Sequence, residues 1–305
     1  MKTFTKNSRY FFLIAVVLLF ILQSAPAEEP GFKQYYLILS NNLRGQDKAV
    51  NSAVNMVNLY FNNKSASKEE VLTQLKASGK KLTDYGNDIN LIKLPALFKN
   101  IQDVALRVSG NNLKVIAILT DMMNANYNFE YTADYLKSVK KLEEITKLLY
   151  HTKIAFISAQ IDLFESNENA KMTEKEKEFF LYYREVLILQ KDFAKIAFDI
   201  SFYSLEYLAG NMEKYEIRIM LQEDLDKSKQ FLLRYEAVNT EGPLFNLHKI
   251  LVNGVLENYM VLKEFSNYLA EIKPCSMNEI QKHFAEVEEI FENYETEKAK
   301  YMENI

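Results

Sequence analysis

Apolar side chains recur in alternating steps of four and three near the end of the chain, where the pattern is clearest. One position in this series is taken by Lys298, and the others are Ile280, Phe284, Val287, Phe291, Tyr294, Tyr301 and Ile305. This spacing predicts a helix over 277–303 with a coiled-coil-like seam. Most of the remaining surface is covered by acidic residues, namely Glu286, Glu288, Glu289, Glu292, Glu295 and Glu297. We therefore expect a peripheral helix that docks one narrow stripe and turns its glutamates to water.

The segment 174–209 has the opposite pattern. Its charged residues fall within an arc of about 120° on a helix with 100° per residue: Arg184, Glu185, Lys191, Asp192, Lys195, Asp199 and Glu206. The rest of its surface is apolar or small, so this helix should contact neighbours on more than one side. We expect it to be the central helix, and it carries too many charges to cross a membrane.

Helix boundaries are marked by capping boxes and by rare breaker residues, since the chain has only eight glycines and five prolines. The capping boxes are Ser67-x-x-Glu70, Thr173-x-x-Glu176 and Ser276-x-x-Glu279, and further breaks are indicated by Pro95, Gly110-Asn111-Asn112 and Pro243. These signals predict helices at 33–62, 67–91, 95–108, 113–127, 132–165, 174–209, 212–238, 243–272 and 277–303.

Long helices joined by short turns predict an all-α fold, with antiparallel helices in an up-and-down bundle and no sheet. Polar residues accumulate between Glu165 and Thr173. This composition allows two linked bundles, an N-terminal region over 28–165 and a C-terminal region over 166–305. A single continuous domain over 28–305 is the alternative.

The N-terminal 27 residues have the pattern of a secretory signal peptide. Basic residues precede an apolar run over 10–22, and Ala25-Pro26-Ala27 provides small residues at the expected cleavage site. The apolar run is short for a membrane span, so we expect cleavage after Ala27, with an uncleaved anchor as the alternative. The chain has one cysteine, Cys275, whereas secreted eukaryotic proteins of this size more often carry several. We therefore expect a secreted or extracytoplasmic protein of a bacterial envelope.

The charge balance argues against a nucleic-acid partner. The precursor has 37 basic and 41 acidic side chains. Removing residues 1–27 takes away Lys2, Lys6 and Arg9 but no acid, which leaves a net charge of −7. Basic and acidic residues are interspersed, whereas phosphate binding needs lysines and arginines clustered on one face.

No motif in the sequence indicates a catalytic, cofactor-binding or metal-binding residue, so we expect no enzyme and no cofactor. His151, His248 and His283 have no partner at metal-ligand spacing, and each is expected to be structural or on the surface. Cys275 lies close to a helix start, where the dipole activates a thiol, but His283 is too far along the same helix to serve as its base. Glycine-rich phosphate loops and a GxSxG elbow are absent.

Two groups of side chains could nevertheless bind a ligand. Aromatic residues concentrate in the central helix, at Tyr182, Tyr183, Phe198, Phe202 and Tyr203. At helical spacing such residues more often form core than line a cleft. Lysines form a basic face on the 132–165 helix, at Lys137, Lys140, Lys141 and Lys147, but neighbouring Glu143 and Glu144 favour a solvated face.

These features favour an exported, non-catalytic helical bundle that acts as a binding, sensing or scaffolding module, because long helices offer grooves and few active-site loops. Its partner would be a protein or another envelope component. One alternative is a secreted, membrane-active helical protein of the pore-forming kind. Its best segment, 113–123, is interrupted by Lys114 and Asp121 and is too short for a span. An enzyme with a carboxylate site assembled from distant helices is a further alternative.

Overall fold

The structure is a computed structural model that describes residues 31–63, 66–125, 132–166, 172–238, 240–269 and 277–305. Within these ranges the chain forms α-helices, one short 3-10 helix and no strand, so the predicted all-α fold is confirmed. The α-helices are α2 (Phe32–Asn63), α3 (Lys68–Leu91), α4 (Lys99–Asn124), α5 (Thr132–Glu165), α6 (Glu174–Ala209), α7 (Lys214–Glu236), α8 (Gly242–Leu269) and α9 (Met277–Asn304). The 3-10 helix is η3 (Ala96–Phe98).

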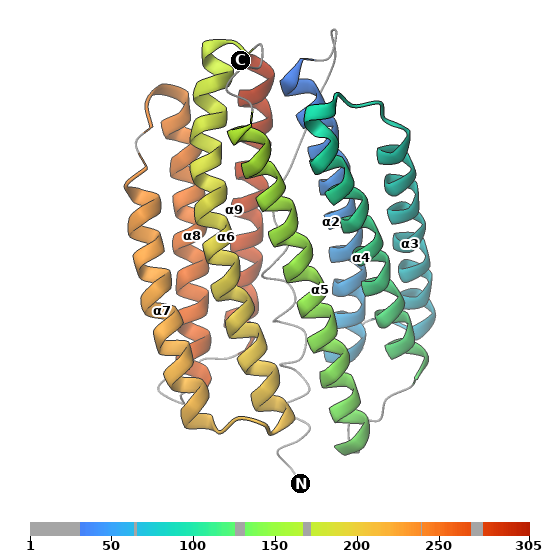
Figure 1. Ribbon diagram of the computed structural model, residues 1–305. Helices are drawn as coiled ribbons and strands as arrows, with labels where there is room; N and C mark the ends of the chain where they lie inside the picture. Colours follow the sequence, from blue (N-terminus) through green and yellow to red (C-terminus); the bar gives the residue numbers. More distant parts are fainter. Residues whose placement is uncertain (1–30, 64–65, 126–131, 167–171, 239, 270–276) are drawn as a thin grey trace.

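The helices are arranged up and down in chain order. Each α-helix packs against the next one, and α2 also packs against α4 (Figure 1). Helices α3 and α7 lie at opposite flanks, while α5 and α6 lie side by side in the middle. This is the bundle packing that the pattern of long helices and short turns predicts.

The buried apolar residues form three clusters, and α6 contributes to all of them. Val186 belongs to the largest cluster, Ala197 to the second and Ile200 to the third. The expectation that 174–209 is the central helix is therefore confirmed. The largest cluster contains residues from every α-helix, from Tyr36 on α2 to Met302 on α9. The division into regions 28–165 and 166–305 stays a prediction.

Two of the predicted capping boxes are confirmed. The Ser67 hydroxyl accepts a hydrogen bond from the Glu70 amide at 3.2 Å, and the Glu70 carboxylate accepts one from the Ser67 amide at 2.6 Å. Thr173 and Glu176 make the same pair of bonds at 3.1 and 2.7 Å. Each box satisfies amide groups that a helix start leaves without partners. The third box begins at Ser276, which lies outside the described residues.

The predicted break at Gly110-Asn111-Asn112 is wrong, because α4 runs through it. Both asparagines are held inside the bundle. Asn111 donates to the Thr152 hydroxyl at 3.1 Å, and Asn112 donates to Gln46 Oε1 at 3.4 Å. The apolar stripe also continues in register on both sides, from Val108 to Val115. Packing and these bonds outweigh the helix cost of about 1 kcal/mol for a glycine.

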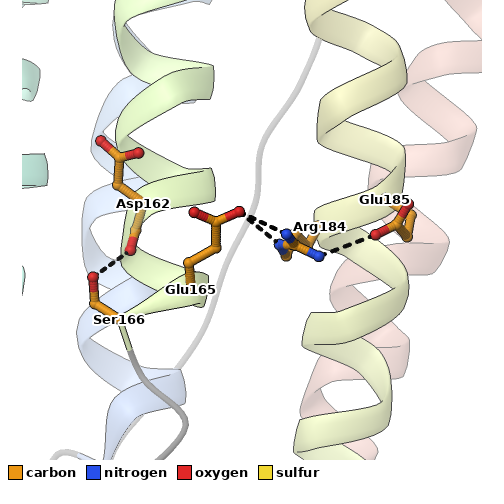
Figure 2. Close-up of polar contacts among 5 residues, drawn as sticks. All are labelled: Asp162, Glu165, Ser166, Arg184 and Glu185. Atoms are coloured by element: carbon orange, nitrogen blue, oxygen red, sulfur yellow. Dashed lines mark hydrogen bonds and ion pairs between the residues drawn. The ribbon is translucent and has the colours of Figure 1, made fainter.

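An ion-pair cluster joins the C-terminal end of α5 to the N-terminal third of α6 at the surface (Figure 2). Arg184 donates to Glu165 Oε1 from Nη2 at 2.6 Å and from Nε at 3.2 Å, and its Nη1 donates to Glu185 at 3.1 Å. The Ser166 hydroxyl donates to the Asp162 carbonyl at 2.7 Å, which closes the C-terminal turn of α5. These contacts fix the start of the 165–173 connection, but exposed ion pairs contribute little stability.

None of the described helices has the length and hydropathy needed to cross a membrane. The predicted signal peptide at 1–27 lies outside the described residues. The segment 113–123, considered above as an insertion segment, lies within α4. Its apolar side chains, including Val115 and Leu119, are buried in the second cluster.

Two glycines of the first helices make a matched test of close packing. A Cβ on Gly45 of α2 would lie 2.2 Å from Cζ of Tyr85 on α3, whereas a Cβ on Gly110 would meet nothing within 4 Å. We expect Gly110→Ala to raise the free energy of unfolding by about 0.5–1 kcal/mol, because alanine favours the helix. Gly45→Ala should be less stable than Gly110→Ala by at least about 1 kcal/mol, because the Tyr85 ring must leave its place.

Urea denaturation of the two variants measures this difference. The double substitution of Gly45→Ala with Tyr85→Ala isolates the clash, since alanine at 85 leaves room for the new methyl group. If Gly45→Ala is as stabilising as Gly110→Ala, the close approach of α2 to Tyr85 is not real.

Candidate functional site

A buried ion pair lies in the C-terminal third of α9. Lys298 is 0% exposed and Glu295 is 2% exposed. Lys298 Nζ lies 2.8 Å from Glu295 Oε1 and 2.7 Å from Oε2, one turn earlier on the helix. Lys298 Nζ also donates to the Tyr183 hydroxyl on α6 at 3.1 Å and lies 4.6 Å from the centre of that ring. The ammonium group therefore contacts one carboxylate, one phenol and the faces of two aromatic rings, those of Tyr183 and Tyr294.

The expectation that Glu295 faces water is wrong. The helix α9 presents a wider buried face than the narrow stripe that the seam predicts, because Glu295 lies on the side that faces the charges of α2 and α5. Lys48 of α2 forms an ion pair with Glu292 at 3.9 Å, and Arg44 of α2 interacts electrostatically with both Glu292 and Glu295. Basic residues of α2 thus lie alongside the acidic flank of α9, where Glu292 stays exposed and Glu295 is buried.

Three more charged side chains approach this pair from neighbouring helices. Arg44 and Asp47 lie one turn apart on α2, and Lys153 lies on α5; all three are half-buried. Asp47 interacts electrostatically with Lys153 and Glu295, and Lys153 interacts with both acids. We name Arg44, Asp47, Lys153, Glu295 and Lys298 the charged junction. It joins α2 and α5 to α9 inside the bundle.

Burial dominates the titration of the charged junction. It raises the pKa of Asp47 to about 7, and the nearby Lys153 opposes this rise. It also lowers the pKa of Lys153 to about 8, against the attraction of Asp47. Burial raises the pKa of Glu295 and lowers the pKa of Lys298, while each partner favours the charged form of the other. Low-dielectric surroundings penalise the charged form in every case.

Tyrosines surround the junction on its apolar side. The Tyr36 hydroxyl donates to Gln160 Oε1 on α5 at 2.6 Å, and the ring of Tyr183 stacks on Phe179 with centroids 5.7 Å apart. Burial raises the pKa of both Tyr36 and Tyr183, so both phenols stay protonated at neutral pH. The expected role of Tyr182 and Tyr183 as core residues agrees with their place in the largest cluster.

His248 is a structural residue of α8. Its Nε2 lies 2.7 Å from the Tyr235 carbonyl oxygen, and its Nδ1 lies 3.3 Å from the Tyr182 hydroxyl. A carbonyl oxygen can only accept, so Nε2 carries the proton and Nδ1 accepts from Tyr182. Burial lowers the pKa of His248, which keeps the ring neutral in this arrangement.

The other candidates from the sequence do not converge. His151 is exposed, with its ring 5.4 Å from that of Tyr150. Cys275 and the side chain of His283 lie outside the described residues. Within the part of the chain that the structure describes, no group of three or more His, Cys, Asp or Glu residues is placed to hold a metal ion.

The basic face of α5 is largely neutralised by acids. Lys137 pairs with Asp134 at 3.7 Å, Lys141 pairs with Asp121 of α4 at 3.8 Å, and Lys147 pairs with Glu143. Lys147 also lies over the ring of Phe202, which stacks on Phe198. This face is therefore balanced in charge, as the neighbouring acids predict.

The titration of Asp47 makes a testable prediction. Its pKa is raised above the value in an unfolded chain, so the folded state binds the proton more tightly and gains stability as the pH falls through 7. We expect wild type to gain stability relative to Asp47→Asn between pH 7.5 and pH 5, because the variant lacks this proton site. Urea denaturation of both proteins at each pH measures it. A difference that stays constant or shrinks toward pH 5 would contradict the raised pKa.

The site that the structure assembles differs from every candidate that the sequence nominated. One signal was present, since Lys298 occupied an apolar position of the seam. Arg44, Asp47 and Lys153 carried no such signal, because each lies among ordinary charged positions of a long helix.

No known protein family, no curated protein and no solved structure matches this chain.

Proposed function

We propose that this chain is an exported, non-catalytic helical bundle that acts as a binding, sensing or scaffolding module. Export is supported by the basic, apolar and small-residue pattern of residues 1–27. The interpretation as a non-catalytic module is supported by the burial of side chains that could otherwise take part in catalysis. Lys298, Glu295 and His248 are each buried in contacts between helices, where they hold the fold together.

The observation that carries the proposal is the charged junction. Arg44, Asp47 and Lys153 are half-buried, and they project from helices rather than from loops. Rigid charged groups without an adjacent nucleophile are suited to hold a ligand in one orientation. The neighbouring Lys298–Glu295 pair holds α9 beside them.

An enzyme with a dispersed carboxylate site is the second candidate, and one observation favours it. Asp47 titrates near neutral pH and is half-buried, as a general base often is. The charged groups that act on its pKa are Lys153 and Glu295, and Glu295 is paired with Lys298. Asp47 alone would therefore have to supply the proton chemistry.

Export is tested by expressing the full chain in a bacterial host and separating cytoplasmic from extracytoplasmic fractions. We expect the protein outside the cytoplasm, with an N-terminal sequence that begins at Glu28. A matched variant replaces Leu18 and Leu19 with aspartate, which interrupts the apolar run and should keep the precursor in the cytoplasm. Export of both chains alike, or of neither, would contradict a signal function for residues 1–27.

Binding is tested with the pure chain 28–305, which is immobilised and exposed to envelope fractions of the native host over a range of salt concentrations. We expect saturable retention of one protein or wall component. The Arg44→Met, Lys153→Met double variant should lose this retention, whereas exposed Lys99→Met should keep it. Equal retention by wild type and both variants would contradict a role of the charged junction in binding. In a separate assay with lipid vesicles, leakage of the vesicles by a chain that retains no envelope component would favour the membrane-active alternative.

A further inference from the structure

The connection between α3 and α4 exposes apolar side chains at one end of the bundle. Residues 91–97 read Leu-Ile-Lys-Leu-Pro-Ala-Leu, and we name them the apolar tip. Leu91 is 78% exposed, the highest value among the large apolar side chains of the described residues, and Leu97 is 37% exposed. Pro95 and Ala96 are also exposed. Single exposed leucines are common, whereas contiguous exposed apolar residues indicate a contact surface.

The bundle holds the apolar tip in this exposed position. Ile89 and Phe98, which flank the tip, are both buried. The Gln102 side chain of α4 donates to the carbonyl oxygen of Ile89 at 2.8 Å and to that of Ile92 at 2.9 Å. The ring of Phe98 lies 5.1 Å from the ring of Phe32 at the start of α2. The exposed leucines are therefore presented by a backbone that is fixed on both sides.

Positive charge accompanies the apolar tip. No acidic residue occurs in the sequence between Asp88 and Asp103, whereas Lys93 and Lys99 lie in this interval. Lys99 pairs with Asp103 at 3.1 Å, which leaves Lys93 as the exposed charge of the tip itself. A lysine among exposed leucines suits the surface of an anionic bilayer, because the apolar side chains enter the interface and the ammonium group stays among the phosphates.

The apolar tip lies at the end of the bundle where α2 begins (Figure 1). The apolar run over 10–22 precedes α2 in the sequence, so it is joined to the bundle at this end. Before cleavage, a bilayer that holds this run is therefore tethered to the end of the bundle that carries the tip. Two apolar segments far apart in the sequence thus favour the same end for contact with lipid.

We propose that the apolar tip docks the bundle, end on, onto the surface of an anionic lipid bilayer. Leu91 and Leu97 enter the headgroup region, and Lys93 contacts lipid phosphates. Seven residues are too few to cross a bilayer, so the contact is peripheral and forms no pore. This inference goes beyond the proposed function, because the tip is a different surface from the charged junction and acts whether or not the junction binds a partner.

The experiment sediments chain 28–305, which contains every described helix, with lipid vesicles. One set contains equal parts of phosphatidylcholine and phosphatidylglycerol, and the other contains phosphatidylcholine alone. We expect several-fold stronger binding to the anionic set, without leakage of an entrapped dye. The Leu91→Ser, Leu97→Ser double variant should bind at least about tenfold more weakly, because two apolar side chains no longer enter the lipid. Lys93→Glu should weaken binding to the anionic set several-fold.

The matched control is the double variant Tyr215→Ser, Ile219→Ser. These residues are 63% and 57% exposed near the start of α7, at the opposite end of the bundle (Figure 1). This variant removes a similar exposed apolar surface and should bind vesicles as wild type does. Circular dichroism should show the same helix content in both double variants, since all four side chains are exposed.

A tryptophan reports the contact directly, because the chain contains none. The emission of Leu91→Trp should shift to shorter wavelength with anionic vesicles, whereas that of Ile219→Trp should not. Absence of vesicle binding, dye leakage, or equal loss of binding in both double variants overturns the proposal.

A second copy of the chain is the other occupant that the experiment identifies. A dimer in lipid-free solution that Leu91→Ser, Leu97→Ser abolishes, without any vesicle binding, overturns lipid docking and assigns the tip to self-association. Vesicle binding without retention of an envelope component leaves this inference standing and contradicts the proposed partner binding at the junction. Retention without vesicle binding does the reverse.

Discussion

Replacing Lys298 with methionine is expected to lower the free energy of unfolding by about 3–5 kcal/mol, because it leaves Glu295 buried without its cation. Glu295 is 2% exposed and has Lys298 as its closest partner, at 2.7 and 2.8 Å. Methionine is similar in length to lysine, so the loss reflects charge more than volume. Urea denaturation at pH 7.5 measures the change.

The matched control is the double variant Glu295→Gln, Lys298→Met. Removing both charges leaves no unpaired ion, so the double variant should recover most of the stability that Lys298→Met loses. Lys300→Met is the surface control, because Lys300 and Glu297 form an exposed ion pair two residues further along the same helix. A double variant that is less stable than Lys298→Met would show that the pair is not the coupled, buried unit described above.

Replacing Phe180 with alanine is expected to cost about 3–5 kcal/mol of unfolding free energy, the range for a large core aromatic. Phe180 is 3% exposed, and its ring lies 5.0 Å from those of Phe32 on α2 and Phe164 on α5. Its loss opens the apolar contact through which α6 meets the first helices of the chain. Thermal and urea unfolding measure the change.

The neighbouring residue provides the control. Leu181 is 65% exposed on the same turn of α6, so Leu181→Ala should change stability by no more than about 0.5 kcal/mol. Equal effects of the two substitutions would mean that α6 does not turn this face toward α2 and α5.

Much of the fold could be predicted from the sequence because its signals are local. Ser67-x-x-Glu70 and Thr173-x-x-Glu176 are capping boxes in the structure, since hydroxyl and carboxylate need only a helix start to bond. The two-sided apolar pattern of α6 likewise identified the central helix. The wrong break at Gly110 shows the limit of such signals, because Asn111 and Asn112 are satisfied by residues far away in the sequence.

The candidate site could not be predicted, because its burial also depends on contacts between helices that are far apart in the sequence. The burial of Glu295 depends on α2 approaching α9, and a charge at a helical position does not reveal which neighbour will cover it. Arg44 and Lys153 are separated by 108 intervening positions of the chain, so no spacing relates them. Lys298 in the apolar seam was the one local signal. A lysine buried in an apolar seam needs an acid nearby on the same helix face. Glu295, one turn before Lys298, is such an acid.

The central claim is that the bundle buries the Lys298–Glu295 ion pair of α9 against Tyr183 of α6. A crystal structure of chain 28–305 tests it most directly. The account predicts Lys298 Nζ within hydrogen-bond distance of the Glu295 carboxylate and of the Tyr183 hydroxyl. A Lys298 side chain that extends into solvent, away from Glu295, would contradict it.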